Sequence, residues 1–238
     1  SAQNLFPNYD MFISPAVSLS GDVTARLSGG LICLVKKEIA KFIERIPVEY
    51  DNIIALRLSN ELFGTELPVV LLGVYLPPCS SSYYQDTDIY NGVAMLEQCI
   101  LDIIDSVGDV LFIVSGDLNA RTGNITTGEH DALDDIIDSF CHHDDASPQT
   151  NRAPKDRIVN DFGKHLLSVC DEFSLSILNG MFDDNESANF TYISPTGCSV
   201  VDYFIVSRMV LKLPLEMNVG QKIESKHMPI ELSFNFDE

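Results

Sequence analysis

Long apolar runs, paired cysteines and basic residues are all scarce in this 238-residue sequence. No apolar run reaches the roughly 18 residues of a membrane helix, so we expect no membrane span. Segment 1–10 lacks the charged-then-apolar pattern of a secretory signal. Six cysteines occur, but none forms a Cys-x-x-Cys pair, so zinc is not expected. Together these absences predict a reduced, intracellular protein of the nucleus or cytoplasm, neither secreted nor attached to a membrane.

Positive charge is also scarce: 15 basic residues stand against 35 acidic ones, for a net charge of −20. Proteins that grip duplex DNA neutralise its phosphates with Lys and Arg. We therefore expect weak or repulsive general attraction to DNA, although a local basic groove remains open. One acidic stretch surrounds His142 and His143, and we interpret it as a solvated loop, with a cation site as the alternative. Its aspartates are Asp131, Asp134, Asp135, Asp138, Asp144 and Asp145.

Short apolar runs rich in β-branched residues recur along the chain and end at turn signals. They predict strands over Gly30–Lys36, Asn52–Leu58, Pro68–Leu76, Val110–Ser115, Leu175–Leu178, Asn189–Ile193, Ser199–Ser207 and Pro229–Phe236. Many are apolar nearly throughout, which is typical of strands buried on both faces.

Two further segments place apolar residues three or four apart, which predicts helices over Ile89–Val107 and Asp161–Phe173. No repeat or low-complexity linker divides the chain, so we expect one domain over residues 1–238. The order of elements predicts an α/β sandwich of four layers. Two mostly antiparallel sheets would pack together, with helices on their outer faces.

The clearest chemical signal is an apolar strand that ends in Gly116-Asp117-Leu118-Asn119. Asp117 and Asn119 are two residues apart, so we expect them to share a face of an extended segment. A carboxylate beside an amide can orient a water and a phosphate oxygen. The bland alternative is an Asx turn.

Three more polar residues stand at strand ends or inside apolar strands. Asp202 lies within Val200–Ser207, and because a buried carboxylate is costly it should have a partner. His227 directly precedes the last predicted strand, and Tyr75 ends another before Pro77. A structural hydrogen bond or an exposed position would explain each of them singly.

In this order and spacing, the four motifs resemble the endonuclease/exonuclease/phosphatase (DNase I-like) superfamily. The resemblance is closest to the endonuclease domains of non-LTR retrotransposons and covers the chain from about residue 6 onward. It rests also on the phrases Gly116-Asp-Leu-Asn-Ala-Arg-Thr-Gly123, Val159-Asn-Asp-Phe-Gly-Lys-His-Leu-Leu-Ser-Val-Cys170, Leu175-Ser-Ile-Leu-Asn-Gly180 and Asn189-Phe-Thr-Tyr192.

The resemblance implies hydrolysis of phosphodiesters, or of phosphomonoesters in some branches, with Mg²⁺ or Mn²⁺. It implies that Asp117 binds metal or activates water and that Asn119 holds the phosphate. Asp202 would orient His227, which would contact the scissile phosphate. Tyr75 would be a further phosphate contact. The residues themselves add Arg121 as another candidate contact, with a plain surface cation as the alternative.

Two departures from the family pattern bear on activity. The family's Ser-Asp-His is Ser225-Lys226-His227 here, so an acid that helps position metal or water has become a cation, unless Lys226 touches phosphate itself. The family also opens with a strand bearing an Asn and a second strand ending in a metal-binding Glu. This chain starts after both, so we expect an N-terminally truncated fold with sheet edges that a homo-oligomer could cover.

Several functions remain open on the sequence alone. One is an impaired, ancestrally DNA-nicking endonuclease domain. A second is an active Mg²⁺-dependent nuclease whose missing ligands come from elsewhere. A third is a binding or scaffold module that needs no metal. The last is a phosphatase for a small substrate, since fold kinship does not fix the substrate.

Overall fold

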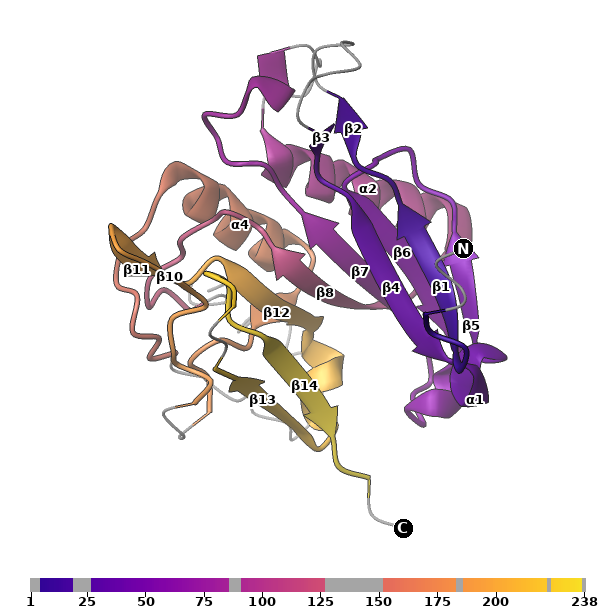
Figure 1. Cartoon of the computed structure of the whole chain (residues 1–238). Helices are drawn as coiled ribbons and strands as arrows, with labels where there is room; N and C mark the ends of the chain where they lie inside the picture. Colours follow the sequence, from indigo (N-terminus) through magenta and orange to yellow (C-terminus); the bar gives the residue numbers. More distant parts are fainter. Residues whose placement is uncertain are drawn as a thin grey trace.

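A six-stranded sheet forms the centre of the molecule (Figure 1). The computed structural model describes residues 5–18, 27–85, 91–126, 152–182, 186–221 and 224–236, so the acidic stretch 131–145 lies outside the described residues. The strand order is β5-β6-β7-β8-β12-β9, antiparallel throughout except for the parallel pair β7 and β8. The strands are β5 (Ile43–Ile46), β6 (Ile53–Leu58), β7 (Val69–Tyr75), β8 (Leu111–Asp117), β9 (Leu175–Ile177) and β12 (Asp202–Ser207).

Two helices, α2 (Gly92–Val107) and α4 (Asp161–Glu172), cover one face of this sheet (Figure 1). Each begins at an asparagine whose side-chain oxygen accepts a hydrogen bond from a backbone N–H of the first turn. Such caps satisfy donors that a helix start leaves open. The apolar stripe of each helix packs on the sheet, where Val70, Leu72 and Val114 are almost fully buried.

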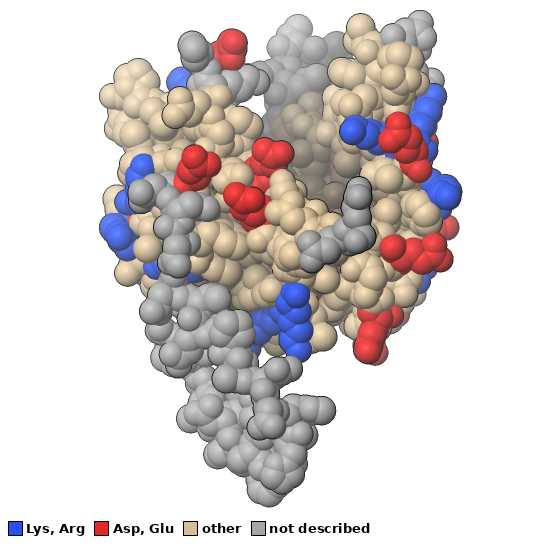
Figure 2. All heavy atoms as spheres, turned by 90° about the horizontal axis from the view of Figure 1, so that it is seen from below, with Lys and Arg blue, Asp and Glu red and all other residues tan. Residues whose placement is uncertain are grey.

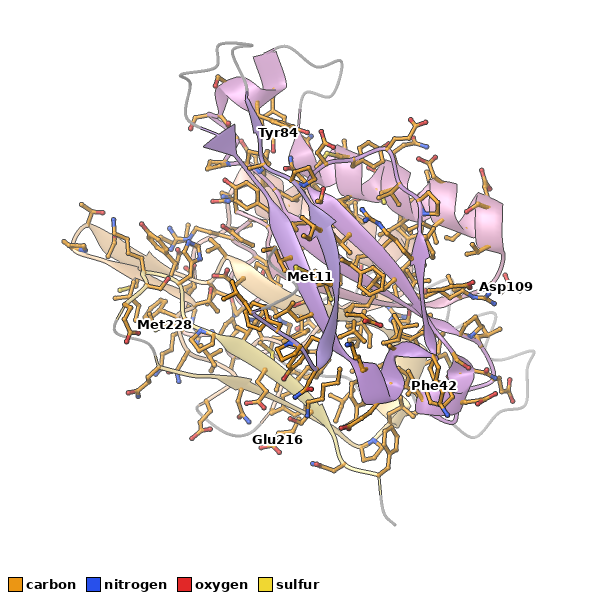
Figure 3. The ribbon with its side chains drawn as sticks, turned by 45° about the vertical axis from the view of Figure 1, so that its right-hand side comes forward. Met11, Phe42, Tyr84, Asp109, Glu216 and Met228 are labelled. Carbon is orange, nitrogen blue, oxygen red and sulfur yellow. The ribbon has the colours of Figure 1, made fainter. Side chains whose placement is uncertain are left out.

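The opposite face of the sheet carries two hairpins. One pairs β1 (Tyr9–Ser14) with β4 (Leu31–Lys36), and the other pairs β13 (Leu215–Val219) with β14 (Ile230–Phe234). Figure 3 shows Met11 on the first hairpin and Met228 beside the second. The inward-facing residues of the two hairpins and the facing side of the sheet form a second apolar core. The two hairpins are separate sheets, so this layer is divided.

Shorter elements complete the described chain. They are β2 (Val17–Ser18), β3 (Leu27–Ser28), β10 (Tyr192–Ser194), β11 (Gly197–Ser199), α1 (Lys37–Ala40) and three turns of 3₁₀ helix, at Asn60–Leu62, Ser82–Gln85 and Arg208–Lys212. The β10–β11 hairpin projects from one side of the molecule (Figure 1).

The predicted α/β class and both predicted helices are confirmed. The run Ser199–Ser207 is divided instead into the end of β11 and the whole of β12. Strands β1, β5 and β13 were not predicted. In β13 apolar residues alternate with polar ones, which is typical of a strand with one exposed face rather than of a fully apolar run.

No helix in the described part of the chain is long and apolar enough to cross a membrane. The five cysteines within that part are free thiols, and Cys99 and Cys170 are buried in the core beneath the helices.

Candidate active site

Two carboxylates meet at the end of the central strands. Asp117 is the last residue of β8 and Asp202 the first of β12, and the two are directly opposite each other in the antiparallel pair. Tyr75, the last residue of β7, is in turn paired with Asp117 in the parallel register. Because residues in register share a face of a sheet, three predicted site residues form one row across three strands.

His227 joins this row from the segment before β14. Its Nδ1 lies 3.1 Å and 3.0 Å from the two carboxylate oxygens of Asp202, and its Nε2 lies 4.0 Å from Asp117 Oδ2. The ring of Tyr192 packs edge-on against the imidazole, with centroids 4.9 Å apart. The carboxylate and the aromatic ring together fix the orientation of the histidine, whose side chain is 41% exposed and can be reached by a ligand.

Asp117 has an altered acidity. Burial and the neighbouring carboxylate of Asp202 raise its pKa to about 6, although a hydrogen bond from the backbone N–H of Asn119 and the nearby His227 oppose the shift. A carboxyl group with a pKa this close to neutrality can exchange protons at physiological pH. The site therefore holds a candidate general base.

Asp117, Asp202 and His227 could also hold a cation, since one ligand atom from each lies within 4.8 Å of the others. Two carboxylates and an imidazole are ligands that divalent metals accept. Mg²⁺ takes about six ligands, and the described residues gather three groups, of which Asp202 is already engaged with His227. These three groups are of the type that a divalent ion accepts, but they provide only part of the ligands it takes.

Asn119 does not share an extended face with Asp117, which corrects the sequence expectation. Strand β8 ends at Asp117, and Asn119 has a left-handed backbone with φ of 47°. Its side-chain Nδ2 donates to the carbonyl of Leu76 at 2.8 Å, which ties the turn to the end of β7. Asn adopts this backbone more readily than most residues because its short side chain can hydrogen-bond locally.

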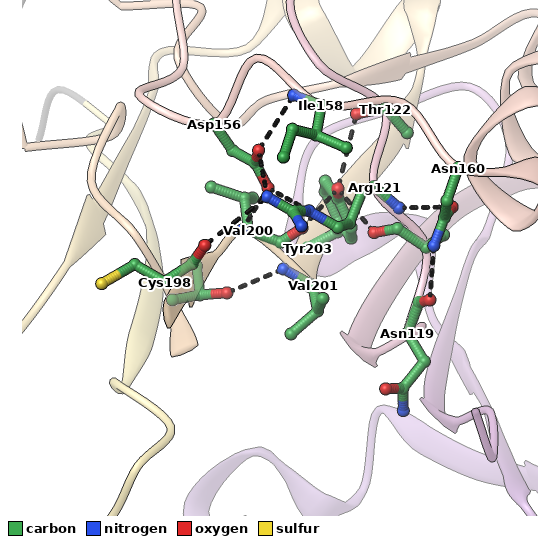
Figure 4. A network of polar contacts seen from close by, with 12 residues as sticks. Asn119, Arg121, Thr122, Asp156, Ile158, Asn160, Cys198, Val200, Val201 and Tyr203 are labelled. Carbon is green, nitrogen blue, oxygen red and sulfur yellow. Dashed lines mark hydrogen bonds and ion pairs between the residues drawn. The ribbon is translucent and has the colours of Figure 1, made fainter. Parts of the chain in front are cut away.

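Arg121 forms an internal ion pair. Its Nε and one terminal nitrogen donate to the two oxygens of Asp156 at 2.8 Å and 2.7 Å (Figure 4). Asp156 also accepts the backbone N–H groups of Ile158 and Val200. Burial alone would raise the pKa of Asp156, but these donors hold it below its ordinary value. Asp156 thus engages two of the three guanidinium nitrogens of Arg121. Contact between Arg121 and a phosphate remains a prediction.

Lys226 lies on the surface beside His227. Its side chain is exposed, and its carbonyl accepts the backbone N–H of Ile193 at 2.8 Å. The backbone contact joins this segment to the β10–β11 hairpin. Contact of the ammonium group with a phosphate remains a prediction.

Three residues that the sequence did not identify hold Asp202 in place. Thr191 Oγ1 accepts the backbone N–H groups of Val201 and Asp202, each at 3.0 Å, and Asn179 Nδ2 donates to the Asp202 carbonyl at 3.1 Å. Buried Arg152 donates from Nε to the Asn179 carbonyl. Thr191 and Asn179 lie within segments Asn189–Tyr192 and Leu175–Gly180, on which the family resemblance partly rests. That resemblance is the sequence signal that could have identified them.

No family model matches this sequence, and no curated protein matches it significantly. Several solved structures, in contrast, are similar to this chain. The endonuclease domain of TRAS1, a telomere-specific non-LTR retrotransposon, aligns over 98% of this chain and 83% of its own, with a TM-score of 0.55 and 16% identity. The 3′ phosphatase NExo from Neisseria, bound to a product DNA hairpin, aligns over 99% and 82%, with a TM-score of 0.54 and 12% identity.

A third structure, AP endonuclease LMAP from Leishmania major, aligns over 94% of this chain and 70% of its own, with a TM-score of 0.61 and 11% identity. At such low identity these likenesses establish the fold. The chain has the endonuclease/exonuclease/phosphatase fold, as its sequence motifs suggested.

Proposed function

We propose that this chain carries a divalent-metal-dependent centre that hydrolyses phosphodiester bonds in DNA, and that its turnover is slow. The cluster of Asp117, Asp202 and His227 is the observation that supports it, because ligand atoms of three residues far apart in the sequence converge within 4.8 Å. The neighbouring structures support DNA as the substrate: one is a retrotransposon endonuclease, and another is a phosphatase bound to a DNA hairpin.

Each residue of the cluster has a defined task in this proposal. Asp117, with its pKa near 6, takes a proton from the attacking water. Asp202 holds His227 through Nδ1, so that Nε2 can donate to a phosphate oxygen. Asp117 would also hold Mg²⁺ or Mn²⁺, which would supply Lewis-acid stabilisation of charge on the phosphate. Asn119 fixes the turn that carries the base.

Slow turnover follows from two features of the chain. The described residues provide three candidate ligand groups, fewer than the roughly six that Mg²⁺ takes. The net charge of −20, and a lysine in place of the family's acid at position 226, disfavour both DNA attraction and cation binding near His227.

The test is nicking of supercoiled plasmid by residues 1–238 with Mg²⁺ or Mn²⁺, beside two variants. Asp117→Ala removes the proposed base, whereas Asp105→Asn removes an exposed carboxylate on helix α2. We expect slow, metal-dependent nicking that Asp117→Ala abolishes and Asp105→Asn leaves unchanged. Equal nicking by Asp117→Ala would identify a contaminating nuclease and reject the assignment.

A binding or scaffold module is the second candidate function, favoured by the partial ligand set and by Lys226. It predicts no nicking at high protein concentration and little heat on titration with Mn²⁺. A phosphatase for small substrates would instead release phosphate from p-nitrophenyl phosphate while leaving plasmid intact.

A further inference from the structure

A cavity of about 340 Å³ lies between helix α2 and the connection from β5 to β6. Residues 47–50 form one wall, and one side of α2 forms the other. The described residues that line it include none of the row formed by Tyr75, Asp117, Asp202 and His227. Its volume is at the lower end of the range for small-molecule sites in proteins. The cavity is therefore large enough for one small ligand or one long side chain.

The floor of the cavity is apolar and belongs to the core beneath the helices. Cys99 and Ile103 of α2 form this floor and are almost fully buried. On the facing wall, Val48 and Tyr50 pack against the same core and keep part of their surface exposed. A planar cation can stack on an aromatic ring such as that of Tyr50. The cavity thus combines apolar surface for a stem with an aromatic ring for a flat head group.

The rim of the cavity is acidic. Glu49 and Asp102 contribute exposed carboxylates from opposite walls, and the Ser106 hydroxyl donates its hydrogen to the Ile103 carbonyl at 3.1 Å. Gln98 Nε2 donates to Asp102 Oδ1 at 2.9 Å, which helps to hold that carboxylate in place. None of the described lining residues is basic. The side chains of the rim therefore offer mainly hydrogen-bond acceptors.

The Tyr50 phenol lies in the negative potential of this rim. Burial, then the Asp102 carboxylate, and then Cys99 and Glu49 raise the pKa of the phenol above its ordinary value. The two carboxylates that disfavour a negative charge at this point favour a positive one there. On the face seen from below, by contrast, acidic and basic side chains of the described residues lie interspersed (Figure 2). The cavity differs from that face because the charges that line it have one sign.

We propose that this cavity binds a guanidinium group on a short apolar stem, either an arginine side chain of a partner protein or a free small molecule of the same chemistry. The guanidinium stacks on the Tyr50 ring and donates to both carboxylates of the rim, while the stem contacts the apolar floor. A guanidinium suits the cavity better than an ammonium group, because it is planar, presents several N–H donors and is more weakly hydrated. This binding site goes beyond the proposed nuclease function and does not depend on it.

Single-residue ligands provide the first test. N-acetyl-arginine amide is titrated into the unaltered chain and followed by NMR of the backbone amides at about 0.15 M salt, which screens distant surface charges. We expect saturable shifts confined to residues 47–50 and helix α2. The matched control is N-acetyl-citrulline amide, which carries a neutral urea and should bind at least about tenfold more weakly, because hydrogen bonds between ions are the stronger ones. N-acetyl-lysine amide, with an ammonium group, should also bind more weakly than the arginine ligand.

Two variants of helix α2 separate a specific contact from the general attraction of cations to a chain with a net charge of −20. Asp102→Asn removes a carboxylate of the rim, whereas Asp105→Asn removes an exposed carboxylate of the same helix that does not line the cavity. We expect Asp102→Asn to weaken binding of N-acetyl-arginine amide at least about fivefold and Asp105→Asn to weaken it less than about twofold. Both residues are exposed, so both variants should fold, and thermal unfolding checks this.

A longer ligand identifies the source of the guanidinium. The capped pentapeptide Gly-Ser-Arg-Ser-Gly has the same charge as N-acetyl-arginine amide and adds main chain that can contact the exposed rim. Tighter binding of the pentapeptide would assign the site to an arginine of a partner protein, because contacts around a buried anchor exclude water from it. Equal affinity would assign the site to a free small molecule. Either result supports the proposed guanidinium site.

Three results would overturn the proposal. One is the absence of saturable shifts at residues 47–50 and α2 up to about 10 mM arginine ligand. Another is a citrulline or lysine ligand that binds as tightly as the arginine ligand. The third is an equal loss of affinity in Asp102→Asn and Asp105→Asn, which would show general electrostatic attraction only. These measurements need neither DNA nor metal, so a failure here is distinguishable from a failure of the proposed nuclease function.

Discussion

Replacing Asp117 by Asn should stabilise the metal-free protein at neutral pH, although it removes the proposed base. In the folded chain, burial and the Asp202 carboxylate raise the pKa of Asp117 to about 6, against an ordinary value of 3.8. The folded state thus holds this proton more tightly than the unfolded state does. Stability from this group is fully present below about pH 4 and is lost as the pH rises through about 6.

The magnitude follows from the same shift. Each pKa unit corresponds to about 1.4 kcal/mol, so ionised Asp117 costs the fold about 3 kcal/mol above the pKa of about 6. Its side chain is only 17% exposed, so solvent screens little of this cost. An asparagine keeps the oxygen that accepts the Asn119 N–H but carries no charge. The gain of Asp117→Asn should therefore approach about 3 kcal/mol at about pH 8 and vanish near pH 4.

Urea unfolding in the presence of EDTA, at several pH values, measures this difference, with Asp105→Asn as the control for loss of one exposed carboxylate. A variant no more stable than the parent at pH 8 would refute the reasoning. A gain that does not shrink toward pH 4 would do so too, because the benefit would then not come from the ionised acid.

Three further substitutions test how the site is supported. Gly116→Ala should cost at least about 3 kcal/mol in urea unfolding, because its φ is 141° and a Cβ would lie 1.9 Å from the Val74 carbonyl. Asn160→Ala should cost about 1 to 2 kcal/mol, since its side chain caps helix α4 at the N–H of Gly163. Arg152→Leu should cost about 2 to 4 kcal/mol by the same measurement, since its buried guanidinium satisfies backbone carbonyls. A loss under about 0.5 kcal/mol in any of the three would contradict its stated role.

Plain patterns in the sequence predicted much of the fold. Asp161–Glu172 has an apolar stripe and a capping asparagine, and it forms helix α4 within a residue of the predicted span. The apolar runs of β6, β7 and β8 became the buried centre of the sheet. The sequence predicts these strands because a central strand buries both of its faces and is therefore apolar nearly throughout. It missed β13, whose polar residues face outward.

The candidate site was predicted in part. Asp117, Asp202 and His227 were each selected from the sequence, and the Asp202 partner expected on grounds of burial cost is His227. The sequence did not identify Thr191 or Asn179, because their roles are hydrogen bonds to backbone atoms of a distant strand. Such contacts leave no periodic pattern in the chain.

What the sequence by itself determined is local: which segments are helices or apolar strands, and which strand ends carry acids, amides and a histidine. Tertiary structure alone decided that Asp117 and Asp202, 85 positions apart, stand side by side in one strand pair. It also decided that Arg121 pairs with Asp156, and that β1–β4 and β13–β14 form two separate hairpins on one face of the sheet. The physical reason is that secondary structure follows from neighbours within a few residues. Register, ion pairing and the coverage of a sheet depend on which distant surfaces pack together.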